Sequence, residues 1–180
     1  MSSLFVNNIK HTGGTTTQTN TSSGAVLMPN VPFCRFTITG ATPAISSIDT
    51  VPITLSNARG ISSPATNQFT VSQTGIYRWE GSCRISAVGT LNYCWIALKD
   101  VTNNRYHNAS TINGGTFDTG VIPYKLDAPN SQNNFVTMDF SHIYQLESSN
   151  NYSFEVSYSG GSSDWKLVQQ QSEFTLILVG

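Results

Sequence analysis

The chain consists of short runs in which apolar and polar residues alternate, separated by turn-forming residues, and this is the pattern of β-strands. The clearest run covers residues 76–85. Tyr77, Trp79, Cys83 and Ile85 share one face there, while Arg78, Glu80, Ser82 and Arg84 share the other. Further strands are predicted over residues 31–39, 51–55, 69–71, 93–99, 135–144, 152–158, 165–168 and 174–179. No segment has a helical period, so eight to ten antiparallel strands indicate a sandwich or jelly roll.

The pattern divides the chain near residue 30. Residues 1–30 begin with a short apolar segment, Leu4 to Ile9, and continue through a Gly/Thr/Ser/Asn tract at 13–24 that has no apolar periodicity. Such a tract cannot support a core of its own. It is either a free tail or an extended arm that docks on its own oligomer or on a larger assembly, and we favour the arm. Residues 31–180 form the predicted single β domain.

Composition supports a folded, nearly neutral domain. Ser, Thr and Asn make up about a third of the chain, only 11% of residues are charged, the net charge is −1 and 11% are aromatic. The Lys and Arg residues do not cluster, so we expect neither a nucleic-acid partner nor an anionic membrane surface. No apolar run approaches the length of a transmembrane helix, which argues against membrane insertion.

Residues with the chemistry of an active site are sparse. The three histidines, His11, His107 and His142, have no His or Cys at metal-ligand spacing, and each is expected to be solvated or hydrogen-bonded. Asp100, Asp118, Asp127 and Asp164 lie in different segments, so no loop concentrates carboxylates for calcium. We therefore expect no catalytic residues, no metal site and no cofactor, and the chain is not expected to be an enzyme.

The three cysteines do not form a recognisable framework. Cys34, Cys83 and Cys94 are odd in number and widely spaced. Cys83 and Cys94 could meet across neighbouring strands, but burial of all three as small apolar residues is the favoured interpretation.

Residues 69–79, Phe-Thr-Val-Ser-Gln-Thr-Gly-Ile-Tyr-Arg-Trp, resemble the signature of the C1q domain, in which an aromatic strand precedes Gly-x-Tyr-x-aromatic. Residues 33–38 are similar to the first strand of that family, and residues 173–178 show a weaker similarity to its last strand. The resemblance covers residues 31–180. It implies a C1q/tumour-necrosis-factor-like jelly roll of about ten strands that assembles as a homotrimer, with both termini close together at the base of the trimer.

The resemblance also gives roles to the aromatic residues. Tyr77 and Trp79 would point into the core. Some of Tyr93, Trp95, Tyr152 and Tyr158 would pack near the three-fold axis, and their burial inside the domain is the equal alternative.

Residues 4–15 resemble the opening of many tailed-phage virion proteins, which start with a short hydrophobic-Val-Asp/Asn-x-Ile segment and continue through a Gly/Thr-rich stretch. Leu4, Phe5, Val6 and Ile9 would then anchor the arm on a capsid. The N-terminus also lacks the basic start and apolar stretch of a secretory signal, which fits a virion protein made in the host cytoplasm.

These observations favour a bacteriophage structural protein, a trimeric capsid decoration or cement protein whose partner is the major capsid protein or another virion protein. One alternative is a tail-fibre or receptor-binding tip, because the loop segments 56–67, 103–116, 127–134 and 159–165 are rich in residues that suit a host glycan. A second alternative is a secreted C1q-like ligand or lectin.

Overall fold

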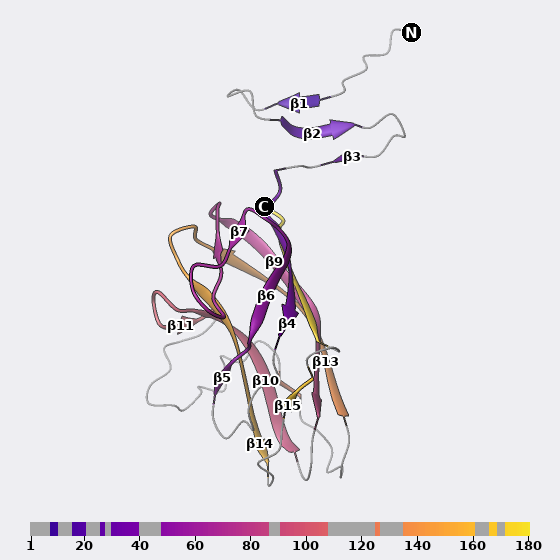
Figure 1. Ribbon diagram of the computed structural model, residues 1–180, viewed down its shortest axis with the longest axis vertical. Coiled ribbons are helices and arrows are strands. Elements are labelled where there is room, and N and C mark those ends of the chain that lie inside the picture. Colours follow the sequence, from indigo (N-terminus) through magenta and orange to yellow (C-terminus); the bar gives the residue numbers. More distant parts are fainter. Residues whose placement is uncertain are drawn as a thin grey trace.

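The computed structural model describes residues 8–10, 16–20, 26–27, 30–39, 48–86, 91–107, 125–126, 135–160, 166–168 and 172–180. Every regular element in these ranges is a β-strand. The strands form an elongated two-sheet knob, and a small separate sheet lies beyond the end of the knob that carries the C-terminus (Figure 1).

The larger sheet of the knob is antiparallel and is built around its long second strand, β9. Its strand order is β13 (Phe135–Leu146), β9 (Gly75–Ser86), β16 (Glu173–Leu178), β4 (Phe33–Ile38) and β6 (Ile53–Arg59). β13 pairs with β9 along its whole length, while β16 and then the short β15 (Lys166–Leu167) pair with its other edge.

The second sheet faces the first and is centred on two long strands. Its order is β11 (Arg105–Tyr106), β10 (Leu91–Asp100), β14 (Tyr152–Gly160) and β5 (Asp49–Thr50), and β12 (Lys125–Leu126) also pairs with β10. A two-stranded ribbon of β7 (Ile61–Ser62) and β8 (Thr70–Val71) lies beside the two sheets. The long strands β9, β10, β13 and β14 alternate between the two sheets along the chain, so the predicted all-β antiparallel jelly roll is confirmed.

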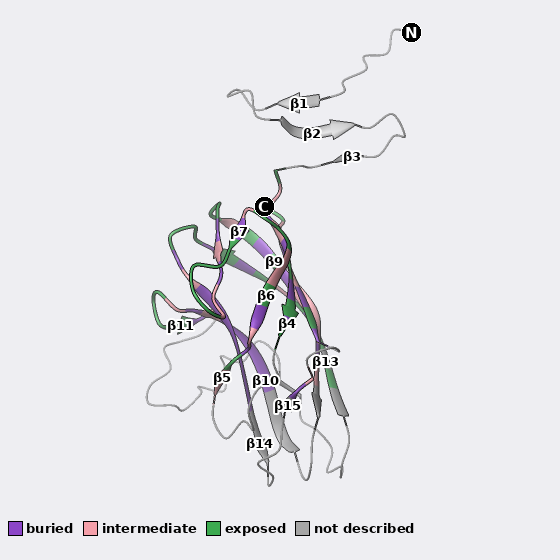
Figure 2. Cartoon of the chain, in the orientation of Figure 1, coloured by how far each residue is buried: buried purple, intermediate pink, exposed green. Residues whose placement is uncertain are grey.

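Alternation within each strand places one set of side chains between the sheets. Cys34, Phe36 and Ile38 of β4 are completely buried, and the residues between them are exposed (Figure 2). Phe154 of β14 lies near the centre of this core. Its ring is within 5.1 Å, between centroids, of the rings of Phe36, Phe69, Trp79 and Phe174. Aromatic rings at these separations add packing energy beyond their burial.

The arm contains more structure than the predicted extended segment. β1 (Asn8–Lys10), β2 (Thr16–Asn20) and β3 (Val26–Leu27) form a three-stranded antiparallel sheet in which β2 is central. Thr19 pairs with Asn8 on one side and with Leu27 on the other. Threonine is β-branched and favours extended backbone, so a Thr-rich tract can pair as a strand even where apolar periodicity is missing.

Candidate assembly surfaces

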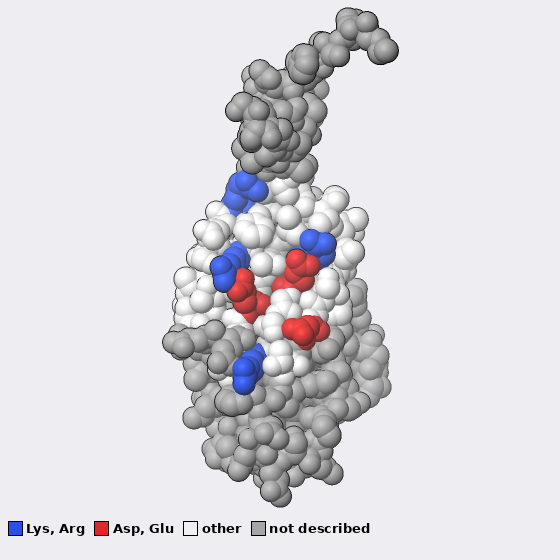
Figure 3. All heavy atoms as spheres, turned by 90° about the vertical axis from the view of Figure 1, so that its right-hand side faces the viewer, with Lys and Arg blue, Asp and Glu red and all other residues white. Residues whose placement is uncertain are grey.

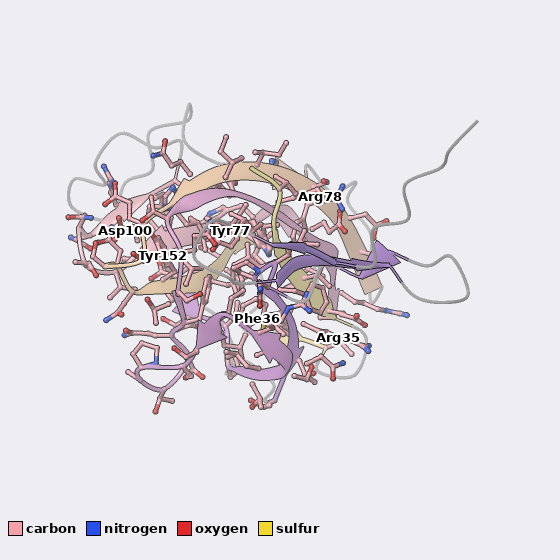
Figure 4. The ribbon with its side chains drawn as sticks, turned by 90° about the horizontal axis from the view of Figure 1, so that it is seen from above. Arg35, Phe36, Tyr77, Arg78, Asp100 and Tyr152 are labelled. Carbon is pink, nitrogen blue, oxygen red and sulfur yellow. The ribbon has the colours of Figure 1, made fainter. Side chains whose placement is uncertain are left out.

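The outer face of the larger sheet is polar, charged and accessible. Arg35 and Glu173 of neighbouring strands form an ion pair of 2.5 Å, and Arg78 and Glu80 of β9 form one of 3.1 Å. These side chains are 40–49% exposed, so the two pairs stabilise the fold little. Figure 3 shows basic and acidic side chains interspersed on this side of the molecule. Arg35 and Arg78 point outward, whereas Phe36 and Tyr77 lie between the sheets (Figure 4).

Three large apolar side chains are exposed together at one end of the larger sheet. Ile76 is 45% exposed, Ile143 60% and Val179 51%. The backbone N–H of Val179 donates to the carbonyl of Ile76 over 2.7 Å, and Ile143 is the cross-strand partner of Arg78, two residues further along β9. We call these three residues the apolar patch. Exposed apolar side chains that gather in this way mark a contact surface more often than scattered ones do.

The apolar patch lies where the chain enters and leaves the knob. The carbonyl of Pro32, next to the start of β4, accepts a hydrogen bond of 3.0 Å from the N–H of Leu178. The carbonyl of the last residue, Gly180, accepts one of 2.6 Å from the N–H of Ile76. The arm therefore departs from the same end of the knob as the C-terminus (Figure 1).

The outer face of the second sheet is buried. Trp95 and Ala97 of β10 and Ser153, Glu155 and Ser157 of β14 are all less than 9% exposed.

The buried carboxylate of Glu155 on this face has two partners. Lys99 forms a 2.9 Å ion pair with Glu155, and the hydroxyl of Tyr106 donates to the other oxygen of the same carboxylate. Burial raises the pKa of Tyr106 far above its usual value, and the hydrogen bond to Glu155 adds to the shift. Because this face is closed, we place the candidate assembly surface on the larger sheet.

A buried carboxylate joins two turns at one end of the second sheet. Asp100 is inaccessible to solvent and accepts hydrogen bonds from the backbone and side-chain nitrogens of Asn103, at 3.0 and 2.8 Å. It also accepts bonds from Arg105 at 3.3 Å and from Asn150 at 3.1 Å. Burial raises the pKa of Asp100, but these hydrogen bonds and the charge of Arg105 together hold it below its usual value. Asp100 is thus a structural anchor for residues 101–104 and for the turn before β14.

The predicted aromatic residues occupy different environments. Tyr77, Trp79 and Tyr152 lie completely buried in the core of the single chain. Trp95 is also completely buried, but on the opposite face of β10, with its ring edge-on to Tyr106 at 6.0 Å between centroids. Tyr93 and Tyr158 belong to β10 and β14, and their side chains lie outside the described residues.

The structure describes only one of the four predicted arm anchors. Ile9 belongs to β1 and pairs with Gln18 of β2. Leu4, Phe5 and Val6 lie outside the described residues.

The suggestion that Cys83 and Cys94 lie on neighbouring strands was wrong. Cys83 lies on β9 and Cys94 on β10, which belong to different sheets. Cys83 is buried, and the side chain of Cys94 lies outside the described residues. Cys34 is a free and buried thiol, and burial raises its pKa to about 12. The thiol of Cys34 is therefore not ionised near neutral pH.

One of the histidines lies in an environment that the sequence did not predict. His107 Nε2 is buried and has no hydrogen-bond partner among the described residues, whereas a solvated or bonded ring was expected. The alternation along residues 135–144 indicates that His142 points inward, because it lies on the same face of the strand as Phe140 and Tyr144. His107 directly follows β11, a strand of two residues that is too short to show a period. Within the described side chains, no group of three or more His, Cys, Asp or Glu residues is arranged to hold a metal ion.

No helix occurs in the described part of the chain, so none there is long and apolar enough to cross a membrane.

Comparisons with known proteins support the fold. No protein-family model matches the chain, and no curated protein sequence matches it. A crystal structure of murine APRIL at pH 5.0 is similar with a TM-score of 0.55 and 8% sequence identity, over 83% of this chain and 99% of the APRIL chain. A second structure of murine APRIL, at pH 8.5, is similar with a TM-score of 0.53 and 10% identity over the same shares. At such low identity the similarity shows the fold alone, and the fold is a tumour-necrosis-factor-like jelly roll.

Proposed function

We propose that this chain is a virion structural protein: a homotrimeric jelly-roll knob that decorates a bacteriophage capsid and is held there by its N-terminal arm. The observation that carries the proposal is the separate sheet of the arm. Among the described strands, β1, β2 and β3 pair only with one another and with no strand of the knob. A sheet of three strands of 3, 5 and 2 residues is too small to be stable alone, and no other described strand pairs with its outer edges.

An arm of this kind needs a surface to dock on, and a capsid shell supplies one. Apolar residues at positions 4, 5, 6 and 9 would anchor the arm, and the open edges of its sheet would accept a strand of the partner. The knob would then remain outside the shell. Stoichiometric docking across subunit boundaries would cement the shell against internal pressure.

The trimer would bring three arms to one end. One side of the contact between copies would be the outer face of the larger sheet, with its charged residues and its apolar patch. A three-fold contact is heterologous, so the patch would meet a different part of the neighbouring knob rather than its own copy. Because the arm and the C-terminus leave the knob beside the patch, the three arms would leave the trimer together.

Two other functions are alternatives to this proposal. A tail-fibre tip would use the same trimer but present its loops to a host glycan, and it would be present in far fewer copies per virion. A secreted ligand of the C1q or tumour-necrosis-factor type is favoured by one observation, the similarity that covers 99% of the murine APRIL chain.

The arm is tested by deleting residues 1–24 and measuring co-sedimentation with capsid shells that lack the protein. The full chain should bind in hundreds of copies per shell. The truncated chain should remain a soluble trimer and fail to bind. Stoichiometric binding by the truncated chain would exclude arm-mediated docking, and binding of the isolated knob to a glycan array would favour the fibre tip instead.

A further inference from the structure

Val31 and Pro32 join the arm to the knob, and we call these two residues the arm root. The carbonyl of Val31 accepts a hydrogen bond of 2.8 Å from Nε of Arg59, at the end of β6. The carbonyl of Pro32 accepts one of 3.0 Å from the N–H of Leu178, at the end of β16. Pro32 is also buried. Because β4 lies between β16 and β6, the arm root is bonded to both strands that flank the strand it leads into.

A β-bulge in β6 turns the end of that strand towards the arm root. Phe33 of β4 pairs with Arg59. Two residues further along β4, Arg35 pairs with Ser56, which lies three residues back along β6. Asn57, between these pairs, has a φ of 51°, in the left-handed region that asparagine tolerates better than most residues. A bulge bends its strand and redirects a side chain, and here it accounts for the reach of Arg59 to the arm root.

Gly60, the residue after β6, packs against the ring of Pro32. It has a φ of 64°, and a Cβ there would lie 2.8 Å from Oγ of Ser72 and 3.1 Å from a ring carbon of Pro32. Its carbonyl accepts a hydrogen bond of 2.8 Å from the N–H of Ser72, directly after β8. Glycine alone combines this conformation with so close an approach. Residues 57–60, which we call the corner, thus contain two residues of positive φ, and both fit the corner around the arm root.

The strand that follows the arm root is held on both sides. β4 is paired antiparallel with β16 and with β6. The hydrogen bonds of an antiparallel pair lie perpendicular to the strands. A pull on the arm along β4, away from the knob, therefore acts across all of these bonds at once, in shear. A pull that separates the arm root sideways from the end of β16 would instead break the bonds one after another, because Pro32 and Leu178 lie at the same end of the two strands.

We propose that the arm root is a force-transmitting attachment: the corner clamps it, and tension on the arm passes in shear into β4 and from there into β16 and β6. The inference rests on the proposed function only for the source of the tension, a shell under internal pressure that pulls on the docked arms. The clamp and the strand geometry belong to the single chain, so they can be tested without a shell.

Single-molecule pulling of the full chain, with one handle at the N-terminus, tests the direction of the load. A second handle at Thr54, an exposed residue of β6 that pairs with Thr37 at the far end of β4, loads β4 and β6 in shear. A second handle at the C-terminus opens β4 and β16 from their common end. At the same force the knob should survive at least about tenfold longer with the handle at position 54. Equal lifetimes, or a longer lifetime with the C-terminal handle, would overturn the force-transmitting attachment.

Arg59→Ala, pulled from position 54, tests the clamp. Its lifetime under load should fall at least about threefold further than the change in its unfolding rate in urea without load accounts for. Arg78→Ala is the matched control, because it removes an exposed ion pair with Glu80 of the same strand, and its lifetime should follow its unloaded rate. A bond that only stabilises the fold would change both rates of Arg59→Ala by the same factor, and that result would overturn the clamp. Neither measurement involves a shell, so a failure here is distinct from a failure of arm-mediated docking.

Discussion

Individual residues are most constrained where two backbones approach closely. Gly81 of β9 pairs with Phe174 of β16, and a Cβ at this position would lie 2.1 Å from the carbonyl oxygen of Glu173 and 2.9 Å from the Cα of Phe174. Gly81 falls at an inward position of the alternating run 76–85, between Trp79 and Cys83. The glycine that interrupts this apolar face was therefore visible in the sequence. The strand that approaches it was not, because its paired residue, Phe174, lies 93 positions further along the chain.

Gly81→Ala is expected to destabilise the knob by about 1–3 kcal/mol, because the added methyl group meets backbone that cannot move without breaking the pairing of β9 and β16. The free energy of unfolding in urea measures the loss. Gly180→Ala is the matched control, since a Cβ there meets only side-chain atoms of Ile76 at 3.8 Å. Equal stabilities of the two variants would show that the strands at Gly81 are not packed as closely as described.

Protonation of Asp100 at low pH is expected to lower the free energy of unfolding. Its pKa is held below the usual value by hydrogen bonds from Asn103 and by the charge of Arg105, against the opposing effect of burial. A lowered folded-state pKa means that the stabilisation is present above the unfolded value of about 3.9 and is lost as the pH falls through the folded one.

Asp100→Asn is expected to cost about 1–3 kcal/mol at neutral pH, since the neutral amide cannot accept the same set of bonds. It should also flatten the fall in stability between pH 5 and pH 2. Urea unfolding of both proteins across this range measures the effect. A variant that loses stability as steeply as the original would assign the acid sensitivity to other carboxylates.

At the level of elements, strands could be predicted wherever one face is buried against a core. The run 135–144 became β13 (Phe135–Leu146), and the run 174–179 became β16 (Glu173–Leu178). The arm sheet could not be predicted, because β2 (Thr16–Asn20) has no buried face in its own sequence to give it a period. Two-residue strands such as β5 and β11 are too short to leave a pattern, and their pairing depends on neighbours distant in sequence.

Thr19→Pro tests whether the arm sheet is needed for docking. Proline removes the N–H of the central strand at a residue that is paired on both sides, so the sheet of β1, β2 and β3 should not form. Co-sedimentation with capsid shells should fall at least about tenfold, which corresponds to 1.4 kcal/mol of docking free energy. Thr19→Val keeps a β-branched side chain and should bind like the original. If both variants bind equally, the arm docks without this sheet.

At the level of the whole molecule, the alternating pattern and the residues around Gly75 led to the correct fold class. The resemblance of residues 69–79 to the C1q signature and the structural similarity to murine APRIL agree on a tumour-necrosis-factor-like jelly roll. The candidate assembly surface could not be predicted from the sequence. Ile76 and Ile143 are distant in sequence and become neighbours only because β13 pairs with β9 in one register.

The closed outer face of the second sheet was also unexpected. Glu155, Lys99 and Tyr106 come from three strands, and no local pattern shows that a glutamate in an alternating run will be buried with a lysine and a tyrosine. The larger sheet, with its charged face and apolar patch, is therefore the surface that we propose for contact between copies.

Sedimentation equilibrium of the chain at micromolar concentration tests the central claim, assembly through this surface, most directly. The protein should sediment at three times the chain mass of 19.5 kDa. Ile143→Asp places a charge in the apolar patch and should shift the mass towards that of a single chain. Ala65→Asp, at an exposed position in the segment that connects β7 and β8, should leave the trimer intact. A single-chain mass for the original protein would contradict the trimer, and an Ile143→Asp variant that remains trimeric would place the contact elsewhere.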